Sequence, residues 1–311
     1  MQALRSLLGG GGDADERLTP YEHSVDYPPR EIGDDNAACE AWYRDVFGAV
    51  EPLPADPSAT PRERQLCRMS ASEYVEARRA GSVTCQEYAA ALVKRALYYR
   101  YMNQWIYTSY ALFDKAVADA AALDARAEAE GVESIAPLYG LAIPMKGTAA
   151  VIDYPAGSGV GVLSGHTPLA DSDLTVLIRE RNGVIFGCTN VPEFAANWVT
   201  ANPASGQTRN PYDHAFTVGG SSGGSASAVA SYMCAVAVTE DTGGSTRVPA
   251  SSNQNFGFDP SRNHYPNVRV ASSLFFSLRI HGFILLGSLR RLALRMQLTG
   301  PPLLRRTVTP A

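Results

Sequence analysis

Two segments rich in glycine and serine hold the residues of this chain best suited to chemistry. The first is Gly219-Gly-Ser-Ser-Gly-Gly-Ser225, and the second is Asp241-Thr-Gly-Gly-Ser-Thr-Arg-Val-Pro249. Glycines let backbone N–H groups turn toward a bound oxygen, and a serine hydroxyl becomes a nucleophile when a base lies within reach. Polar segments with small side chains are poor core builders. The two segments therefore form a candidate site that still needs a base.

Lys146 is the candidate base. It ends the short apolar run at 141–145 and is followed by Gly147. A lysine at the end of a hydrophobic strand is unusual, because taking its ammonium out of water is costly and lowers its pKa. A neutral lysine could accept a proton from a serine. The alternative is a lysine that snorkels to the surface and takes no part in chemistry.

Helical patterns precede these motifs in the chain. Ser70-Ala-Ser-Glu73 is typical of a capping box, and Ser82-Val-Thr84 predicts the cap of a second helix. An alanine-rich helix is expected at 111–130, ended by Gly131. The N-terminal region of the domain is therefore predicted to be helical.

Short apolar runs alternate with helical patterns beyond residue 138. Strands are expected at 141–145, 183–188 and 233–238, and helices at 173–181 and 225–231. This alternation predicts an α/β domain with a buried sheet.

Composition limits the classes of function. A chain of 311 residues can bury a sizeable core, and a net charge of -4 gives no electrostatic footprint for nucleic acid. The five cysteines form no C-x-x-C pair and their count is odd, which favours reduced thiols over a disulfide framework. The first 17 residues are too polar for a secretory signal, so the cytoplasm is the expected compartment.

Charge also divides the chain. Residues 267–311 contain seven arginines and no lysine, aspartate or glutamate. We expect a flexible arm at 1–69 with one helix near 36–47, a catalytic domain at 70–266, and an aberrant arginine-rich tail at 267–311. The tail is interpreted as a misread gene model or a truncation. A basic amphipathic helix at 274–298 that associates with a membrane is the alternative.

In combination, these motifs resemble those of the amidase signature family, over roughly residues 70–265. The resemblance is carried by five motifs, three of which precede the two glycine-serine segments in the chain. In order, these three are Pro137-Leu-Tyr-Gly-Leu-Ala-Ile-Pro-Met-Lys146, Gly187-Cys-Thr-Asn-Val-Pro-Glu-Phe194 and Asn210-Pro-Tyr-Asp213. It implies a mixed sheet flanked by helices, and an incomplete domain because family domains are typically much longer.

The resemblance also implies roles for the serines and the lysine. Ser245 matches the nucleophile, Ser221 the bridging serine that the family holds on a cis peptide bond, and Lys146 the base. One departure stands out: Gly147 and Thr148 follow the lysine, where family members usually have an acidic residue and an asparagine.

Residues beside the nucleophile receive supporting roles. The resemblance implies an oxyanion hole made by the backbone N–H groups of Thr242, Gly243 and Gly244. Asp241 and Arg247 flank this loop. We expect them to pair and fix its shape rather than to take part in the reaction.

The expected function is that of a serine amidohydrolase that acts on a small-molecule amide without a metal or cofactor. A catalytically silent amidase remnant, acting if at all as a binding or interaction protein, is the main alternative. An esterase of the Ser-His-acid type is another, because Gly219-Gly-Ser221-Ser-Gly223 fits a nucleophile elbow. No strand leads directly into Gly219, however, and the five histidines show no triad arrangement.

Overall fold

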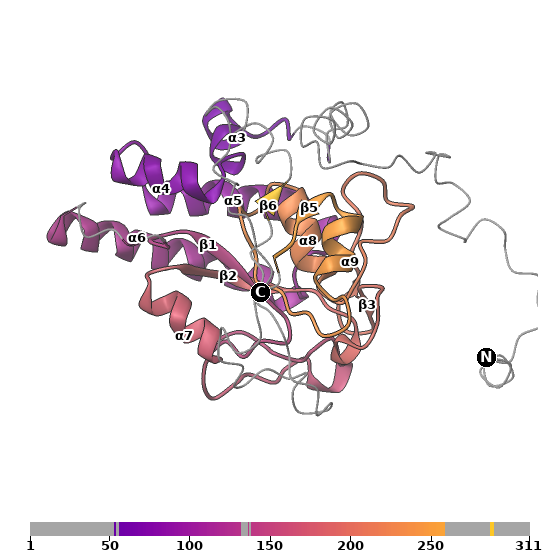
Figure 1. The fold of residues 1–311 in the computed structure, drawn as a ribbon. Coiled ribbons are helices and arrows are strands. Elements are labelled where there is room, and N and C mark those ends of the chain that lie inside the picture. The colour runs from indigo at the N-terminus through magenta and orange to yellow at the C-terminus, as the bar shows by residue number, and fades with distance from the viewer. Residues whose placement is uncertain (1–52, 54–55, 132–135, 137, 259–286, 289–311) are drawn as a thin grey trace, which may run out of the picture. The chain divides into compact units, whose positions relative to one another are not determined.

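The structure of the protein is a computed structural model that describes residues 53, 56–131, 136, 138–258 and 287–288 (Figure 1). The expected helix at 36–47, and the tail from 267 apart from residues 287–288, lie outside the described residues. Helices and strands alternate after residue 138, as the sequence predicts. The described chain has the mixed α/β character expected of an amidase-signature-like fold.

Side-chain caps set the starts of two N-terminal helices. Helix α4 (Ala71–Arg79) begins after Ser70, whose hydroxyl accepts a hydrogen bond from the Glu73 N–H at 3.2 Å. In return, Glu73 Oε2 accepts one from the Ser70 N–H at 2.7 Å. The predicted capping box is confirmed. Helix α5 (Cys85–Tyr98) begins after Thr84, whose side chain caps it as expected.

The predicted alanine-rich helix is also present, and the stretch expected to be a flexible arm contains a helix that was not foreseen. Helix α6 (Phe113–Glu130) ends at Gly131. Helix α3 (Pro61–Cys67), begun by a capping box at Thr60, lies within the stretch expected to be a flexible arm. Its Leu66 is buried and the helix packs on α5. The described end of that arm is therefore helical and packed, because Leu66 contributes to the core.

A parallel pair of strands positions the candidate base. Strand β1 (Ala142–Lys146) pairs with β2 (Val184–Thr189), in a register that sets Lys146 opposite Thr189. Every residue of both strands is buried, as expected for parallel strands covered on both faces. The pairing places Lys146 at the carboxyl end of this small sheet.

Helices cover these strands. Helices α6 and α7 (Asp173–Glu180) contact β2, and α8 (Gly223–Ala230) contacts β1. The predictions of helices at 173–181 and 225–231 are therefore confirmed to within two residues. The sheet edge that carries Lys146 is thus held against the helix that follows the first glycine-serine segment.

The apolar run at 233–238 is not a strand, contrary to the sequence analysis. Its residues are all buried, and the Val238 N–H donates to the Pro144 carbonyl of β1 at 2.8 Å. Pro144 has no N–H to donate in return, so β1 cannot continue a regular ladder on this side. The run instead packs beside β1 without forming a strand.

Shorter elements complete the described chain. Strands β3 (Ala201–Asn202) and β4 (Gly206–Gln207) form one antiparallel pair, and β5 (Asn255–Phe256) forms another with β6 (Gly287–Ser288). A last α-helix, α9, spans Arg247–Ser252. Short 3₁₀ helices lie at Arg100–Met102 (η2), Tyr107–Leu112 (η3), Gly161–Leu163 (η5) and Glu193–Ala195 (η6). Among the described residues, no helix combines the length and hydropathy that a bilayer crossing requires.

The cysteines of the described chain are structural. Cys67, Cys85, Cys188 and Cys234 are all buried thiols. Burial raises the pKa of the Cys188 thiol to about 12, which keeps it protonated and unreactive at neutral pH.

Helix α8 meets a neighbouring segment so closely that one position requires glycine. A Cβ added to Gly224 would lie 2.4 Å from the backbone N of Asn190 and 2.4 Å from the carbonyl oxygen of Gln104. The Gly224 N–H donates to the Asn190 carbonyl at 3.2 Å. The placement of α8, and of Ser221 just before it, therefore depends on the absence of a side chain at Gly224.

Replacing Gly224 with alanine should lower the free energy of unfolding by about 2 kcal/mol or more, because the new methyl group would displace backbone atoms. Urea unfolding followed by circular dichroism measures this change. Gly165→Ala is the control, since its Cβ would meet nothing within 4 Å and should change stability by less than about 0.5 kcal/mol. Equal losses in the two variants would contradict the argument.

Candidate active site

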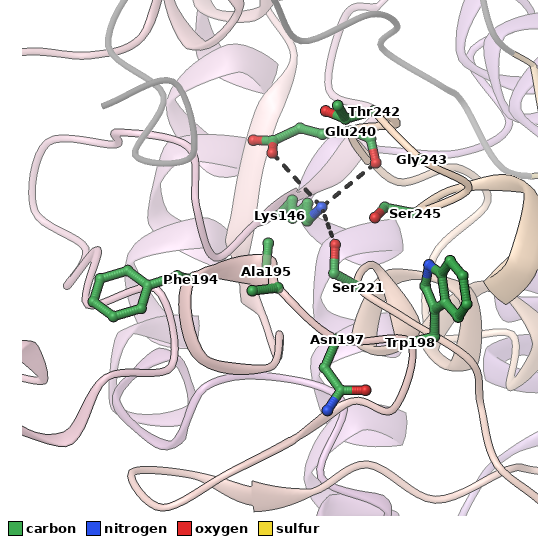
Figure 2. Close-up of a pocket in the computed structure, with 11 residues that line it drawn as sticks. Lys146, Phe194, Ala195, Asn197, Trp198, Ser221, Glu240, Thr242, Gly243 and Ser245 are labelled. Carbon is green, nitrogen blue, oxygen red and sulfur yellow. Dashed lines mark hydrogen bonds and ion pairs between the residues drawn. The ribbon is translucent and has the colours of Figure 1, made fainter. Parts of the chain in front are cut away.

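A pocket of about 530 Å³ brings together the residues singled out from the sequence (Figure 2). Lys146, Ser221 and Ser245 all line it, although they come from segments far apart in the chain. Phe194 and Trp198 contribute aromatic side chains to the same pocket. The three predicted catalytic residues therefore face one space.

Lys146 is buried with an exposed fraction of 1%, so it does not snorkel to the surface. Its Nζ donates a hydrogen bond to Ser221 Oγ at 2.8 Å and lies 3.5 Å from the Glu240 carbonyl oxygen (Figure 2). Burial lowers the pKa of this amine from its ordinary value, and the carboxylate of Glu240 opposes the shift. The amine is thus placed and predisposed to exchange a proton with Ser221.

Ser221 lies in the first glycine-serine segment, just before α8, and is completely buried. The Gly220–Ser221 peptide bond is cis, in agreement with the resemblance. A Cβ on Gly220 would lie 2.7 Å from the Asn197 carbonyl oxygen, so the backbone passes close to the pocket wall. The Ser222 N–H donates to the Ser245 carbonyl at 3.1 Å. This bond joins the two glycine-serine segments beside Ser221 and Ser245.

Ser245 is partly exposed and lies beside Ser221 at the pocket (Figure 2). In the described part of the chain, no hydrogen bond joins the hydroxyl groups of Ser221 and Ser245. Contacts between catalytic groups commonly tighten when substrate binds. The arrangement can therefore support proton transfer between the serines after a side-chain rotation.

Asp241 organises the loop that carries Ser245. Its Oδ1 accepts a hydrogen bond from the Gly244 N–H at 2.7 Å, and its Oδ2 accepts from the N–H groups of Thr246 and Arg247 at 3.0 and 3.1 Å. The Arg247 guanidinium donates two further bonds at 3.0 and 2.9 Å. The two side chains are thus paired, as the sequence analysis expected.

The predicted set of oxyanion donors needs a correction. The Gly244 N–H already points at the Asp241 carboxylate, so it does not face the pocket as a free donor. Thr242 and Gly243 do line the pocket. In the described part of the chain, neither of their N–H groups donates a hydrogen bond. The oxyanion-hole prediction is therefore kept for Thr242 and Gly243 and not for Gly244.

Glu240 is a pocket residue that the sequence analysis missed. Its carboxylate is buried and lies 3.6 Å from Lys146 Nζ, while Thr148 Oγ1 donates to its other oxygen at 2.6 Å. The sequence offered one signal, namely the absence of an acidic residue directly after the lysine. A Cβ on Gly147 would lie 2.6 Å from the Thr189 carbonyl oxygen, so a side chain does not fit there. Here the carboxylate comes from a distant segment instead.

Lys146 and Glu240 are the titratable residues of the pocket lining. Of the described histidines, neither His166 nor His214 lines the pocket. Within residues 56–131, 138–258 and the other described positions, no group of three or more histidine, cysteine, aspartate or glutamate side chains could hold a metal ion. The ionisable groups of the described pocket lining are therefore one amine and one carboxylate.

Asp241→Asn should lower the free energy of unfolding at pH 7 by about 2 kcal/mol. Burial raises the pKa of Asp241, but hydrogen bonds from Arg247 and the backbone outweigh it and lower the pKa from 3.8 to about 2. This stabilisation is present above about pH 4 and is lost as pH falls through about 2, so the wild-type and variant stabilities should converge in acid.

Urea titrations at several pH values measure this convergence. Asp213→Asn, at an exposed position, is the control and should leave stability nearly unchanged at every pH. A constant difference between wild type and Asp241→Asn from pH 7 to pH 2 would show that the charge of Asp241 is not responsible.

Comparisons with known proteins identify the family of this chain. Residues 91–297 match the family model described as Amidase. This match extends beyond the predicted break at 267, so the domain limits stay a prediction. A glutamyl-tRNA(Gln) amidotransferase subunit from Thermobifida fusca is 35% identical over 213 residues, 68% of this chain and 42% of the relative. The chloroplastic/mitochondrial counterpart from Oryza sativa subsp. indica is 39% identical over 141 residues, 43% of this chain and 26% of the relative.

These relatives include organellar and bacterial proteins by name, so the cytoplasmic assignment also stays a prediction. The chain spans less than half the length of each of them.

Solved structures are similar over part of their length. A bacterial aryl acylamidase of the amidase signature family has a TM-score of 0.59 and 28% identity, covering 64% of this chain and 41% of that one. Fatty acid amide hydrolase has a TM-score of 0.65 and 20% identity, covering 89% of this chain and 55% of that one, which shows a shared fold. From the family match and the fold together, the chain belongs to the amidase family.

Proposed function

We propose that the protein hydrolyses a carboxylic amide through a Ser-Ser-Lys triad and an acyl-enzyme. The observation that carries the proposal is the 2.8 Å hydrogen bond between Lys146 Nζ and Ser221 Oγ in a pocket that Ser245 also lines. A serine hydroxyl is too weakly acidic to attack an amide unaided, so its proton needs an acceptor. The buried lysine and the completely buried serine provide a route for that proton.

The first half of the reaction forms the acyl-enzyme. Neutral Lys146 accepts the proton of the Ser221 hydroxyl while Ser221 accepts the proton of Ser245. The Ser245 oxygen bonds to the amide carbonyl carbon, and the carbonyl oxygen becomes an oxyanion. The proton returns by the same route to the amide nitrogen, the C–N bond breaks and the amine leaves.

The oxyanion is stabilised by the backbone N–H groups of Thr242 and Gly243. Each aligned donor of this kind is worth about 3 kcal/mol in comparable sites. Water then attacks the ester on Ser245, with Lys146 and Ser221 again accepting and returning a proton. The carboxylic acid leaves and the serine hydroxyl is restored.

The substrate is an amide small enough to enter a pocket of about 530 Å³. The indole of Trp198 is 63% exposed and so is available to pack on an apolar group of a ligand. The similar aryl acylamidase and fatty acid amide hydrolase are both named for amide chemistry. An aryl amide such as an acyl nitroanilide is therefore a suitable first substrate.

Ser245→Ala should abolish covalent labelling by a fluorophosphonate and hydrolysis of the nitroanilide, because the nucleophile is gone. Ser221→Ala and Lys146→Ala should each lower the labelling rate by about 100-fold or more, because they interrupt the proton route. The measurement is the labelling rate of purified full-length protein. Ser251→Ala, on the exposed side of α9, should label at the wild-type rate.

Other outcomes would support the alternatives. Labelling that survives Lys146→Ala would favour an esterase that uses a histidine base. Folded wild-type protein that does not react at Ser245 would contradict the proposed hydrolysis and favour a silent binding remnant.

A further inference from the structure

A carboxylate and an amine are buried together at the base of the pocket. Glu240 and Lys146 have exposed side-chain fractions of 4% and 1%, and Glu240 Oε2 lies 3.6 Å from Lys146 Nζ. Burying an ionic group costs several kcal/mol unless a partner of opposite charge lies close by. The catalytic scheme above uses Lys146 and Ser221 but gives the carboxylate no part.

Glu240 is held in place from two sides. The Thr148 hydroxyl donates to Oε1 at 2.6 Å. The other oxygen, Oε2, is directed at the amine (Figure 2). The Glu240 carbonyl accepts from the Ser222 hydroxyl at 3.4 Å and lies 3.5 Å from Lys146 Nζ. The orientation of the carboxylate is therefore fixed by residues on both flanks of the site.

The other groups that face Lys146 are uncharged or already paired. From β2 the nearest partner in register is Thr189, and from the start of α8 it is Ser221, both neutral. Asp241 also attracts the amine, but its carboxylate is engaged by the Arg247 guanidinium. In the described part of the chain, Glu240 is thus the carboxylate in direct contact with Lys146.

We propose that Glu240, oriented by Thr148, is a positioning residue that holds Lys146 Nζ against Ser221 and stabilises the buried ammonium that forms when Lys146 accepts the serine proton. This role rests on the proposed function. It parallels that of the buried carboxylate that stabilises a protonated histidine in a Ser-His-Asp triad.

The proposal has a definite electrostatic sign. Burial lowers the pKa of Lys146, and an amine made too weak a base would no longer accept a serine proton effectively. The nearby carboxylate favours the protonated amine and counters this loss. Neutralising Glu240 should therefore lower the pKa of Lys146 further.

The chain is well suited to a direct measurement of this pKa. It contains three lysines, Lys94, Lys115 and Lys146, so protein labelled with carbon-13 at lysine Cε gives few signals, and Lys146→Met assigns the relevant one. In a pH titration by NMR, the pKa of Lys146 should be lower in Glu240→Gln than in wild type. An unchanged pKa would overturn the proposal.

Two further comparisons make the test specific. Asp171→Asn removes another mostly buried, ion-paired carboxylate away from the pocket lining, and it should leave the Lys146 signal unmoved. Thr148→Val removes the 2.6 Å bond and should lower the pKa of Lys146, whereas Thr148→Ser should restore it. If Glu240→Gln fails to fold, the two Thr148 variants provide the test. Equal pKa values of Lys146 in Thr148→Val and Thr148→Ser would overturn the proposal.

Kinetics separate this inference from the proposed function. The labelling rate at Ser245 should rise with pH as Lys146 deprotonates. In Glu240→Gln that rise should move to lower pH, and the plateau should fall about tenfold because the base is weaker. Wild-type protein that is not labelled would refute the proposed hydrolysis. The NMR titration would still report the effect of Glu240 on the pKa of Lys146. Labelled wild type whose pH profile is unchanged in Glu240→Gln would refute the role of Glu240 alone.

Discussion

Burial of a single amine is the constraint on which the rest of the site depends. Lys146 sits at the carboxyl end of a strand that is buried along its whole length, so water cannot solvate its charge. The polar groups that contact Nζ are the Ser221 hydroxyl and the carbonyl and carboxylate of Glu240. The balance between burial and these contacts sets how readily the amine takes a proton. That balance is the property that the proposed reaction uses.

Close backbone approach is the second physical requirement. Glycine at 220 lets the chain pass beside the pocket wall, and glycine at 224 lets α8 lie against the segment that follows β2. The hydrogen bond from Ser222 to the Ser245 carbonyl then ties the two glycine-serine segments together. Side chains at these glycines would separate the hydroxyl groups, because the backbone atoms they would meet belong to the elements that carry the site.

Charge is distributed within the site so that each carboxylate has its own partner. Asp241 is committed to Arg247 and to three backbone N–H groups, and this shapes the loop around Ser245. Glu240, the preceding residue, turns toward Lys146 and Thr148 instead. Adjacent acidic residues thus act in different directions. One fixes the backbone of the loop that carries Ser245, and the other faces the amine.

The sequence by itself determined the local features of this protein. Some features depend only on neighbouring residues and could therefore be predicted from sequence patterns. They are the capping box at Ser70, the end of α6 at Gly131 and the strands that lead to Lys146 and Asn190. The grouping of Lys146, Ser221 and Ser245 was also accessible, through the ordered motifs of the amidase family.

Only the tertiary structure decided the features that depend on long-range contacts. The run at 233–238 has the composition of a strand, but the proline of β1 opposite it cannot complete a ladder. The Gly244 N–H donates a hydrogen bond to the Asp241 carboxylate, and no spacing pattern in the sequence indicated this bond. Glu240 meets Thr148 across 92 positions of the chain. A sequence pattern records which groups are present, whereas the partner of a buried charge is set by how the folded chain brings distant segments together.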